Sequence, residues 1–212
     1  MKIKAAIISN GLEGLHYYYK SNKTISYSII EITRDFNPYF SSFDLLIIPN
    51  GSDHIALYKI KNKIHQFLDE GKTLFCFDGW FTNWLPGSRW VMDNSKKTID
   101  IRYKIKSDRR NLFKNVNIDG LIFSKGISGW WACGYIIPAT DAEILLEDTW
   151  NRAIIILDET TTNGIIIATA SGPLADITYQ TTNDNNSMND ISILYKNLLE
   201  FIQNKIKQSI NN

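Results

Sequence analysis

Six residues that could take part in chemistry follow two apolar runs in the first half of the chain. The runs cover 44–49 and 73–77, and the residues after them are Asn50, Gly51, Asp53, His54, Asp78 and Gly79. Continuous apolar runs of this length are typical of parallel strands that are covered on both faces. Ligands of open α/β sheets bind outside the carboxyl ends of such strands. We therefore expect the two loops to form a crevice that binds a small molecule.

Asp78 is the candidate catalytic residue of this crevice. A carboxylate that directly follows a buried strand can act as a general acid or base, as a nucleophile or as a metal ligand. The alternative is that Asp78 caps the segment that follows it, which is a common use of aspartate. The two roles are compatible.

Asn50, Gly51, Asp53, His54 and Gly79 are predicted to bind the substrate from the same two loops. Asp53, His54 and Gly51 each have a structural alternative. Ser52 or Asp53 can cap a helix that starts at His54, and an aspartate there is favoured by the helix dipole. Gly51 allows a ligand to approach closely, but a tight turn between strand and helix requires a glycine as well.

Five of the six tryptophans lie in two irregular segments, and they are a second signal. They are Trp80, Trp84, Trp90, Trp130 and Trp131. Tryptophan offers a large apolar face and one N–H donor, so Trp80, Trp130 and Trp131 are predicted to form a wall that stacks on a sugar ring or a planar ligand. The alternative is that the tryptophans belong to the core or to a homodimer interface.

The periodicity of the chain predicts an α/β fold with helices on both faces of a mostly parallel central sheet, in three layers. Strands are predicted at 2–9, 24–32, 44–49 and 73–77, with an amphipathic helix at 54–70. Further strands are predicted at 98–105, 142–146, 153–157 and 164–170, of which the last two form a hairpin. A polar linker at 181–190 leads to a C-terminal helix. We expect one domain that spans 1–212.

Composition excludes several classes of protein. The formal net charge of +1 gives no electrostatic reason to expect nucleic acid or an anionic membrane as a partner. No apolar run reaches the roughly 18 residues of a membrane span. Cys76 and Cys133 do not form a CxxC pair, so a reducing, cytoplasmic location is expected.

Neither a metal nor a cofactor is predicted. Glu13 and His16 could join Asp53 or Asp78 in a mixed histidine and carboxylate site, but no HxH or HExxH pattern accompanies them. The sequence also contains neither a Walker A motif nor a complete GxGxxG motif.

Three segments resemble the class I glutamine amidotransferase-like superfamily and, more loosely, its trehalose-utilisation (ThuA-like) branch. They are Ile48-Pro49-Asn50-Gly51, the run from Gly71 to Asp78, and Ser171-Gly172-Pro173 after the hairpin. The resemblance implies a flavodoxin-like α/β fold with a nucleophile elbow after the strand at 73–77. It also implies that a backbone N–H near Gly51 helps to bind an anion.

The chain departs from that family at the catalytic positions. The elbow position, which is cysteine in true amidotransferases, falls on Asp78, while Cys76 lies inside the strand and is expected to be a small hydrophobic core residue. The family's histidine lies near the last strand, whereas His16, His54 and His65 all lie in the first third of this chain. A thiolate nucleophile needs such a neighbour to lower its pKa.

We therefore predict a small-molecule enzyme that does not hydrolyse glutamine and that acts on a carbohydrate or a related polar metabolite, with Asp78 as acid and base. The main alternative is a catalytically silent binding or interaction subunit that uses the same crevice. A third reading is true amidotransfer with Cys133 or Cys76 as a displaced nucleophile.

Overall fold

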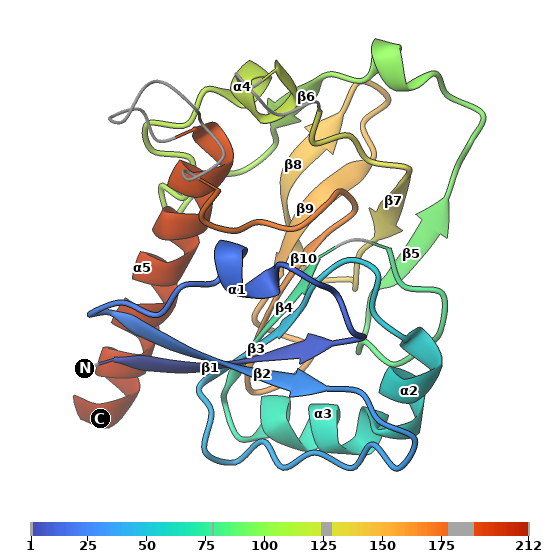
Figure 1. The fold of residues 1–212 in the computed structure, drawn as a ribbon. Coiled ribbons are helices and arrows are strands. Elements are labelled where there is room, and N and C mark those ends of the chain that lie inside the picture. Colours follow the sequence, from blue (N-terminus) through green and yellow to red (C-terminus); the bar gives the residue numbers. More distant parts are fainter. Residues whose placement is uncertain (1, 78, 124–128, 178–188, 212) are drawn as a thin grey trace.

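The computed structural model describes residues 2–77, 79–123, 129–177 and 189–211. The described strands form one ten-stranded sheet whose central part is parallel (Figure 1). Its five parallel strands lie in the order β2-β1-β3-β4-β10. They are β1 (Ile3–Ser9), β2 (Ile25–Glu31), β3 (Leu45–Ile48), β4 (Thr73–Phe77) and β10 (Ile165–Thr169). Every residue of β3, β4 and β10 is buried, as expected for strands that are covered on both faces.

An antiparallel extension continues the sheet beyond β10. The predicted hairpin is confirmed, because β9 (Ala153–Asp158) pairs antiparallel with β10. The remaining strands are β5 (Arg89–Met92), β6 (Tyr103–Ile105), β7 (Gly134–Ile137) and β8 (Glu143–Asp148). β7 and β8 both pair with β9, while β5 pairs with β7 and β6 pairs with β8.

Helices cover the two faces of the parallel strands, so the predicted three-layer architecture is confirmed. Figure 1 shows α5 on one side of these strands and the α2–α3 pair on the other. Tyr195 of α5 packs edge-on against Phe75 of β4, with ring centroids 6.4 Å apart. The helices are α1 (Leu15–Tyr18), α2 (His54–Lys59), α3 (Lys61–Asp69), α4 (Ile118–Phe123) and α5 (Asp190–Asn211), with a 3₁₀ turn at Thr98–Asp100. No helix in the described ranges has the length and apolar character needed to cross a membrane.

The structure differs from the sequence prediction at several elements. The helix expected at 54–70 is divided at Ile60, whose N–H is shared between the carbonyls of Ala56 and Leu57. The strand expected at 98–105 is a 3₁₀ turn followed by the short β6. β5 and β7 form where irregular chain was expected, because each completes the other's backbone hydrogen bonds. The expected linker at 181–190 falls outside the described residues except for its last two positions.

Candidate functional site

The carboxyl ends of the parallel strands lie along one edge of the sheet. Ile48 of β3 is level with Cys76 of β4, and Thr169 of β10 is level with Phe77. The connection after β1 leads to β2 on one side, whereas the connection after β3 leads to β4 on the other side, since the strand order is β2-β1-β3-β4-β10. Ligands of such sheets bind where the strand order reverses in this way. The candidate site is therefore this edge of the sheet, which we call the switch-point crevice and define by the loops 9–12, 50–51, 79–81 and 171–173.

Glycines form the turns on both sides of the switch point. Gly11 has a φ of 68° and Gly51 a φ of 75°, a conformation that favours glycine. The N–H of Gly11 donates to the Glu31 carboxylate at the end of β2, at 3.0 Å. A Cβ on Gly51 would lie 3.6 Å from the Leu12 side chain, which shows that the two loops are neighbours. Asn50 and Gly51 are exposed, so a ligand can reach their backbone from solvent.

Asp53 is the N-cap of α2. Its Oδ1 accepts hydrogen bonds from the N–H groups of Ile55 and Ala56, both at 2.9 Å. A cap of this kind stabilises a helix by about 1 kcal/mol. The capping alternative is thus confirmed, and the carboxylate oxygen that caps the helix is already occupied.

His54 connects the loop after β3 to the segment after β4 through two hydrogen bonds. The indole N–H of Trp84 donates to Nδ1 of His54 at 3.1 Å, and the hydroxyl of Thr82 donates to the His54 carbonyl at 2.9 Å. Burial lowers the pKa of His54, although the nearby Asp53 charge and a hydrogen bond with the Gly79 backbone oppose that shift. The Nδ1 atom accepts a hydrogen bond, so it carries no proton. His54 is therefore a neutral imidazole, and its hydrogen bonds hold the two loops of the crevice in place.

The lowered pKa of His54 predicts a pH-dependent stability. An unfolded histidine takes up a proton near pH 6.5, whereas folded His54 resists protonation, so the unfolded chain binds more protons below that pH. Folding stability should therefore fall as the pH drops from 7 to 5. A His54→Asn variant offers Trp84 an acceptor that does not titrate, and should lose less stability over this range when urea unfolding is measured at both pH values.

A histidine without such contacts supplies the control for that experiment. His16 is exposed on α1, so His16→Asn should retain the wild-type pH dependence. Equal losses of unfolding free energy in wild type and His54→Asn would show that protonation of His54 does not limit stability.

Most of the tryptophans are core residues. Trp80, Trp84, Trp90 and Trp130 are between 0% and 7% exposed. Trp84 is held on both sides, since the ring of His65 also bonds to its carbonyl at 3.0 Å. His65 of α3 is therefore a structural partner of Trp84. The indole N–H of Trp130 donates to the Gly172 carbonyl at 2.8 Å.

The predicted ligand wall is accordingly corrected. Trp80 and Trp130 have almost no exposed surface, because their rings fill the interior beside the sheet. Trp131 is half-buried and retains an accessible face. Sequence reasoning missed Phe81, which is 69% exposed and stands edge-on to Trp90 and His54, at centroid distances of 5.0 and 5.8 Å.

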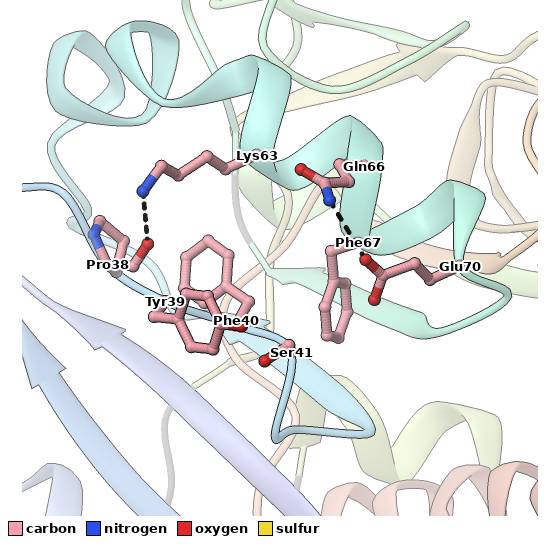
Figure 2. A pocket seen from close by; sticks show the side chains of 8 residues that line it. All are labelled: Pro38, Tyr39, Phe40, Ser41, Lys63, Gln66, Phe67 and Glu70. Carbon is pink, nitrogen blue, oxygen red and sulfur yellow. Dashed lines mark hydrogen bonds between the residues drawn. The ribbon is translucent and has the colours of Figure 1, made fainter.

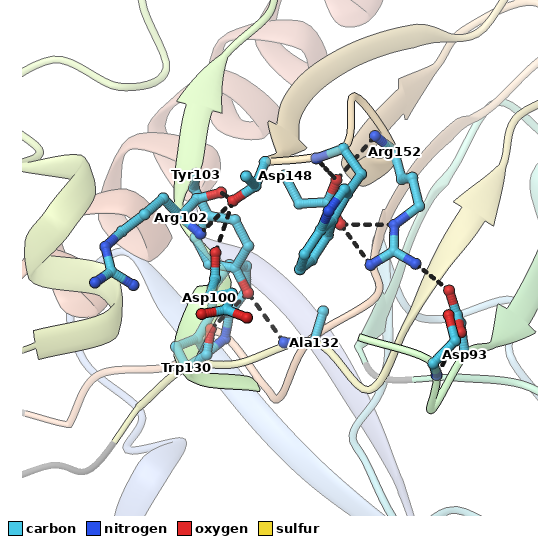
Figure 3. A network of polar contacts seen from close by, with 11 residues as sticks. Asp93, Asp100, Arg102, Tyr103, Trp130, Ala132, Asp148 and Arg152 are labelled. Carbon is cyan, nitrogen blue, oxygen red and sulfur yellow. Dashed lines mark hydrogen bonds and ion pairs between the residues drawn. The ribbon is translucent and has the colours of Figure 1, made fainter. Parts of the chain in front are cut away.

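A polar network holds the loop that carries Trp131 (Figure 3). The hydroxyl of Tyr103 donates to the Trp130 carbonyl at 2.9 Å and accepts from the N–H of Ala132 at 3.0 Å. Nearby, the carboxylate of Asp93 forms an ion pair with Arg152. The backbone N–H of Asp93 donates to the carbonyl of Cys133 at 3.2 Å. The loop is thus fixed on both sides of Trp131.

A shallow hollow lies elsewhere, between the segment 38–41 and α3 (Figure 2). Lys63 donates to the Pro38 carbonyl at 2.9 Å, and Lys72 donates to the Ser41 carbonyl at 2.8 Å. This segment precedes β3, so the hollow is at the amino-terminal side of the strands. Its two lysines tie the segment to the helix and to the start of β4.

Comparison with known proteins bears on the fold. No family model matches the chain, and no curated protein matches it either. A cytoplasmic protein from Salmonella typhimurium LT2 superposes with a TM-score of 0.60 at 12% identity, covering 94% of this chain and 99% of that one. A glutamine amidotransferase from Thermotoga maritima superposes with a TM-score of 0.54 at 8% identity, covering 100% and 87%. The chain has a glutamine-amidotransferase-like fold.

On this fold, the cysteine of β4 belongs to the core. Cys76 is 1% exposed and lies within the strand, whereas Cys133 is exposed on the loop before β7. Asp78, the predicted acid and base, lies outside the described residues, and β4 ends one residue before it, as the sequence predicts. Among the described residues, three or more His, Cys, Asp or Glu side chains do not come together as a metal site would require.

Proposed function

We propose that the protein is a small-molecule enzyme that does not hydrolyse glutamine and that binds a carbohydrate or a related polar metabolite in the switch-point crevice. Asp78 is its acid and base, and the backbone of Asn50 and Gly51 supplies donors to the substrate. A cytoplasmic location is part of this proposal, and the Salmonella neighbour is described as cytoplasmic.

The observation that carries the proposal is the arrangement of loops at the switch point. Asn50 and Gly51 are exposed on the loop that leads to His54, and the exposed ring of Phe81 stands edge-on to the His54 ring with centroids 5.8 Å apart. Sugars are bound by donors for their hydroxyls together with an aromatic face for their C–H surface, and Phe81 offers such a face. Trp131 is a second aromatic side chain with accessible surface.

The absence of glutaminase activity is inferred from the cysteine and the histidines. Cys76 is buried within β4, and a nucleophilic thiolate needs a base or a cation beside it. His54 and His65 both bond to Trp84, and Nδ1 of His54 is occupied by the indole N–H. These histidines therefore have structural partners.

Ammonia release from L-glutamine tests this part of the proposal. We expect no release above the buffer rate from wild type, Cys76→Ser or Cys133→Ser. Release by wild type that is abolished in either cysteine variant would establish amidotransferase chemistry with that cysteine as nucleophile.

Binding of neutral sugars tests the crevice. Glucose and trehalose should raise the melting temperature of the wild type, because a ligand at about 100 times its Kd stabilises the native state by about 2.7 kcal/mol. Phe81→Ala should weaken sugar binding about tenfold, since a stacked ring contributes on the order of 1 kcal/mol or more. Tyr39→Ala is the matched control, as Tyr39 is 78% exposed on the segment 38–41. Equal melting shifts in the two variants would remove the crevice from consideration.

A catalytically silent binding subunit is the second candidate, and the role of His54 favours it. His54 has a structural role, because its Nδ1 accepts the hydrogen bond from the Trp84 indole. Any acid–base catalysis in the crevice therefore depends on Asp78 alone. NMR spectra of a bound sugar over time separate the two functions. Turnover that is lost in Asp78→Asn supports the enzyme, whereas binding without turnover in the wild type supports the binding subunit.

A further inference from the structure

A cavity of about 380 Å³ lies between the beginnings of β1 and β2 and the first half of α5. Figure 1 shows α5 passing beside these strand ends, which are opposite to the switch-point crevice. Ile3, Ile25 and Leu199 form the apolar part of its lining. Its volume falls within the range of about 300–1,000 Å³ that is usual for small-molecule sites.

Two tyrosines from different elements meet at this cavity. The hydroxyls of Tyr27 on β2 and Tyr195 on α5 are 2.6 Å apart and hydrogen-bonded, and both residues line the cavity. Burial raises the pKa of both phenols, so each keeps its hydrogen at neutral pH. The pair therefore has two hydrogens, of which its mutual bond uses one.

The second hydrogen has no acceptor among the described residues. The pair is half-buried, and a hydroxyl hydrogen in such a place normally has a partner. Since the donor belongs to one of the two tyrosines that line the cavity, a molecule in the cavity can supply the acceptor. The pair thus indicates a ligand with a hydrogen-bond-accepting atom.

Charge around the pair restricts that acceptor. The carboxylate of Asp176 also lines the cavity, and its negative charge raises the pKa of both Tyr27 and Tyr195. The same charge would repel an anionic ligand oxygen at the phenols. Lys20, Lys196 and Glu200 complete a mixed set of charges along the lining, so neither sign predominates. A neutral carbonyl oxygen fits this surrounding better than a carboxylate or a phosphate.

We propose that this cavity is a second binding site, which takes a neutral organic molecule with an apolar body and a carbonyl oxygen. The carbonyl accepts the spare hydrogen of the Tyr27–Tyr195 pair, while the body packs against Ile3, Ile25 and Leu199. The site is separate from the switch-point crevice, and its existence does not depend on the function proposed there.

Two small aromatic probes test the role of the phenol pair. Acetanilide carries a neutral carbonyl, whereas ethylbenzene has a comparable body without one. Dissociation constants come from saturation-transfer NMR titrations of each probe with the full chain. In Tyr27→Phe/Tyr195→Phe the Kd of acetanilide should rise about fivefold to tenfold, and that of ethylbenzene should not change. The double variant removes both hydroxyls at once, so it leaves neither of them unpaired.

Two further variants locate the binding. Leu199→Trp fills the cavity and should abolish the binding of both probes. Tyr58→Phe is the matched control, because Tyr58 is exposed on α2, and it should leave both dissociation constants unchanged. The proposal is overturned if acetanilide does not bind the wild type, if it binds the double phenylalanine variant equally well, or if it still binds Leu199→Trp.

Discussion

Replacing Arg152 by methionine should lower the free energy of unfolding by about 3–5 kcal/mol, because the change leaves a buried carboxylate without its cation. Asp148 is 1% exposed, and its Oδ2 accepts a 2.7 Å hydrogen bond from Nε of Arg152. The guanidinium also pairs with Asp93 and lies over the rings of Tyr135 and Trp150, 5.0 and 4.9 Å from their centroids. Urea unfolding of the two proteins measures the difference.

A carboxylate that has two lysine partners supplies the control. Lys104 pairs with the buried Glu147 at 2.9 Å, but Lys106 pairs with the same carboxylate at 3.4 Å, so Lys104→Met leaves Glu147 with a cation and should have an effect of about 1 kcal/mol or less. Asp148→Asn/Arg152→Met should be less destabilising than Arg152→Met alone, since the uncompensated charge is gone. An effect of Arg152→Met no larger than that of Lys104→Met would contradict the importance of the buried pair.

The central strands could be predicted from the sequence because their signal is local. The run at 73–77 became β4 with the same bounds, and the run at 44–49 contains β3. The N-cap of α2 was also visible, since Asp53 precedes the amphipathic pattern directly. Gly71 ends the helical segment with a φ of 79°, a conformation that favours glycine.

The outer strands β5 and β7 could not be predicted in the same way, because their hydrogen bonds join distant segments. Arg89 of β5 pairs with Ile137 of β7, and neither strand has an alternating or continuous apolar pattern of useful length. Each strand is defined by its partner. A single sequence gives no information about such pairing when the strands are only four residues long.

The candidate site shows the same limit at the level of single residues. His54 lies directly after the loop that follows β3, as the sequence predicts, but its role depends on the indole of Trp84, 30 positions later. Residue type alone does not distinguish a tryptophan that stacks on a ligand from one that fills the interior, and Trp80 and Trp130 are of the second kind. Phe81 was overlooked because its exposure follows from the packing of its neighbours.

Replacing Gly134 by alanine should destabilise the fold by about 3 kcal/mol, at the upper end of the usual effect of overpacking. A Cβ there would lie 2.2 Å from the carbonyl oxygen of Val91 on the paired strand and 2.8 Å from the ring of Trp90. The first neighbour is backbone, so β5 and β7 would have to separate. Gly172→Ala is the control, as its Cβ would meet only Trp130 at 3.9 Å, and it should change the unfolding free energy by about 0.5 kcal/mol or less.

Trp90 provides a way to distinguish a side-chain clash from a backbone clash. A Cβ on Gly79 would meet only the Trp90 ring among its three nearest atoms, at 2.3–2.6 Å, whereas the nearest atom to a Cβ on Gly134 is a backbone oxygen. Trp90→Leu should therefore relieve most of the added destabilisation of Gly79→Ala and little of that of Gly134→Ala. Double-mutant cycles on the two pairs measure this difference. An equal coupling energy in the two cycles would contradict this distinction. It would mean that β5 and β7 can move apart, so that the Trp90 indole is the only obstacle to a Cβ at either position.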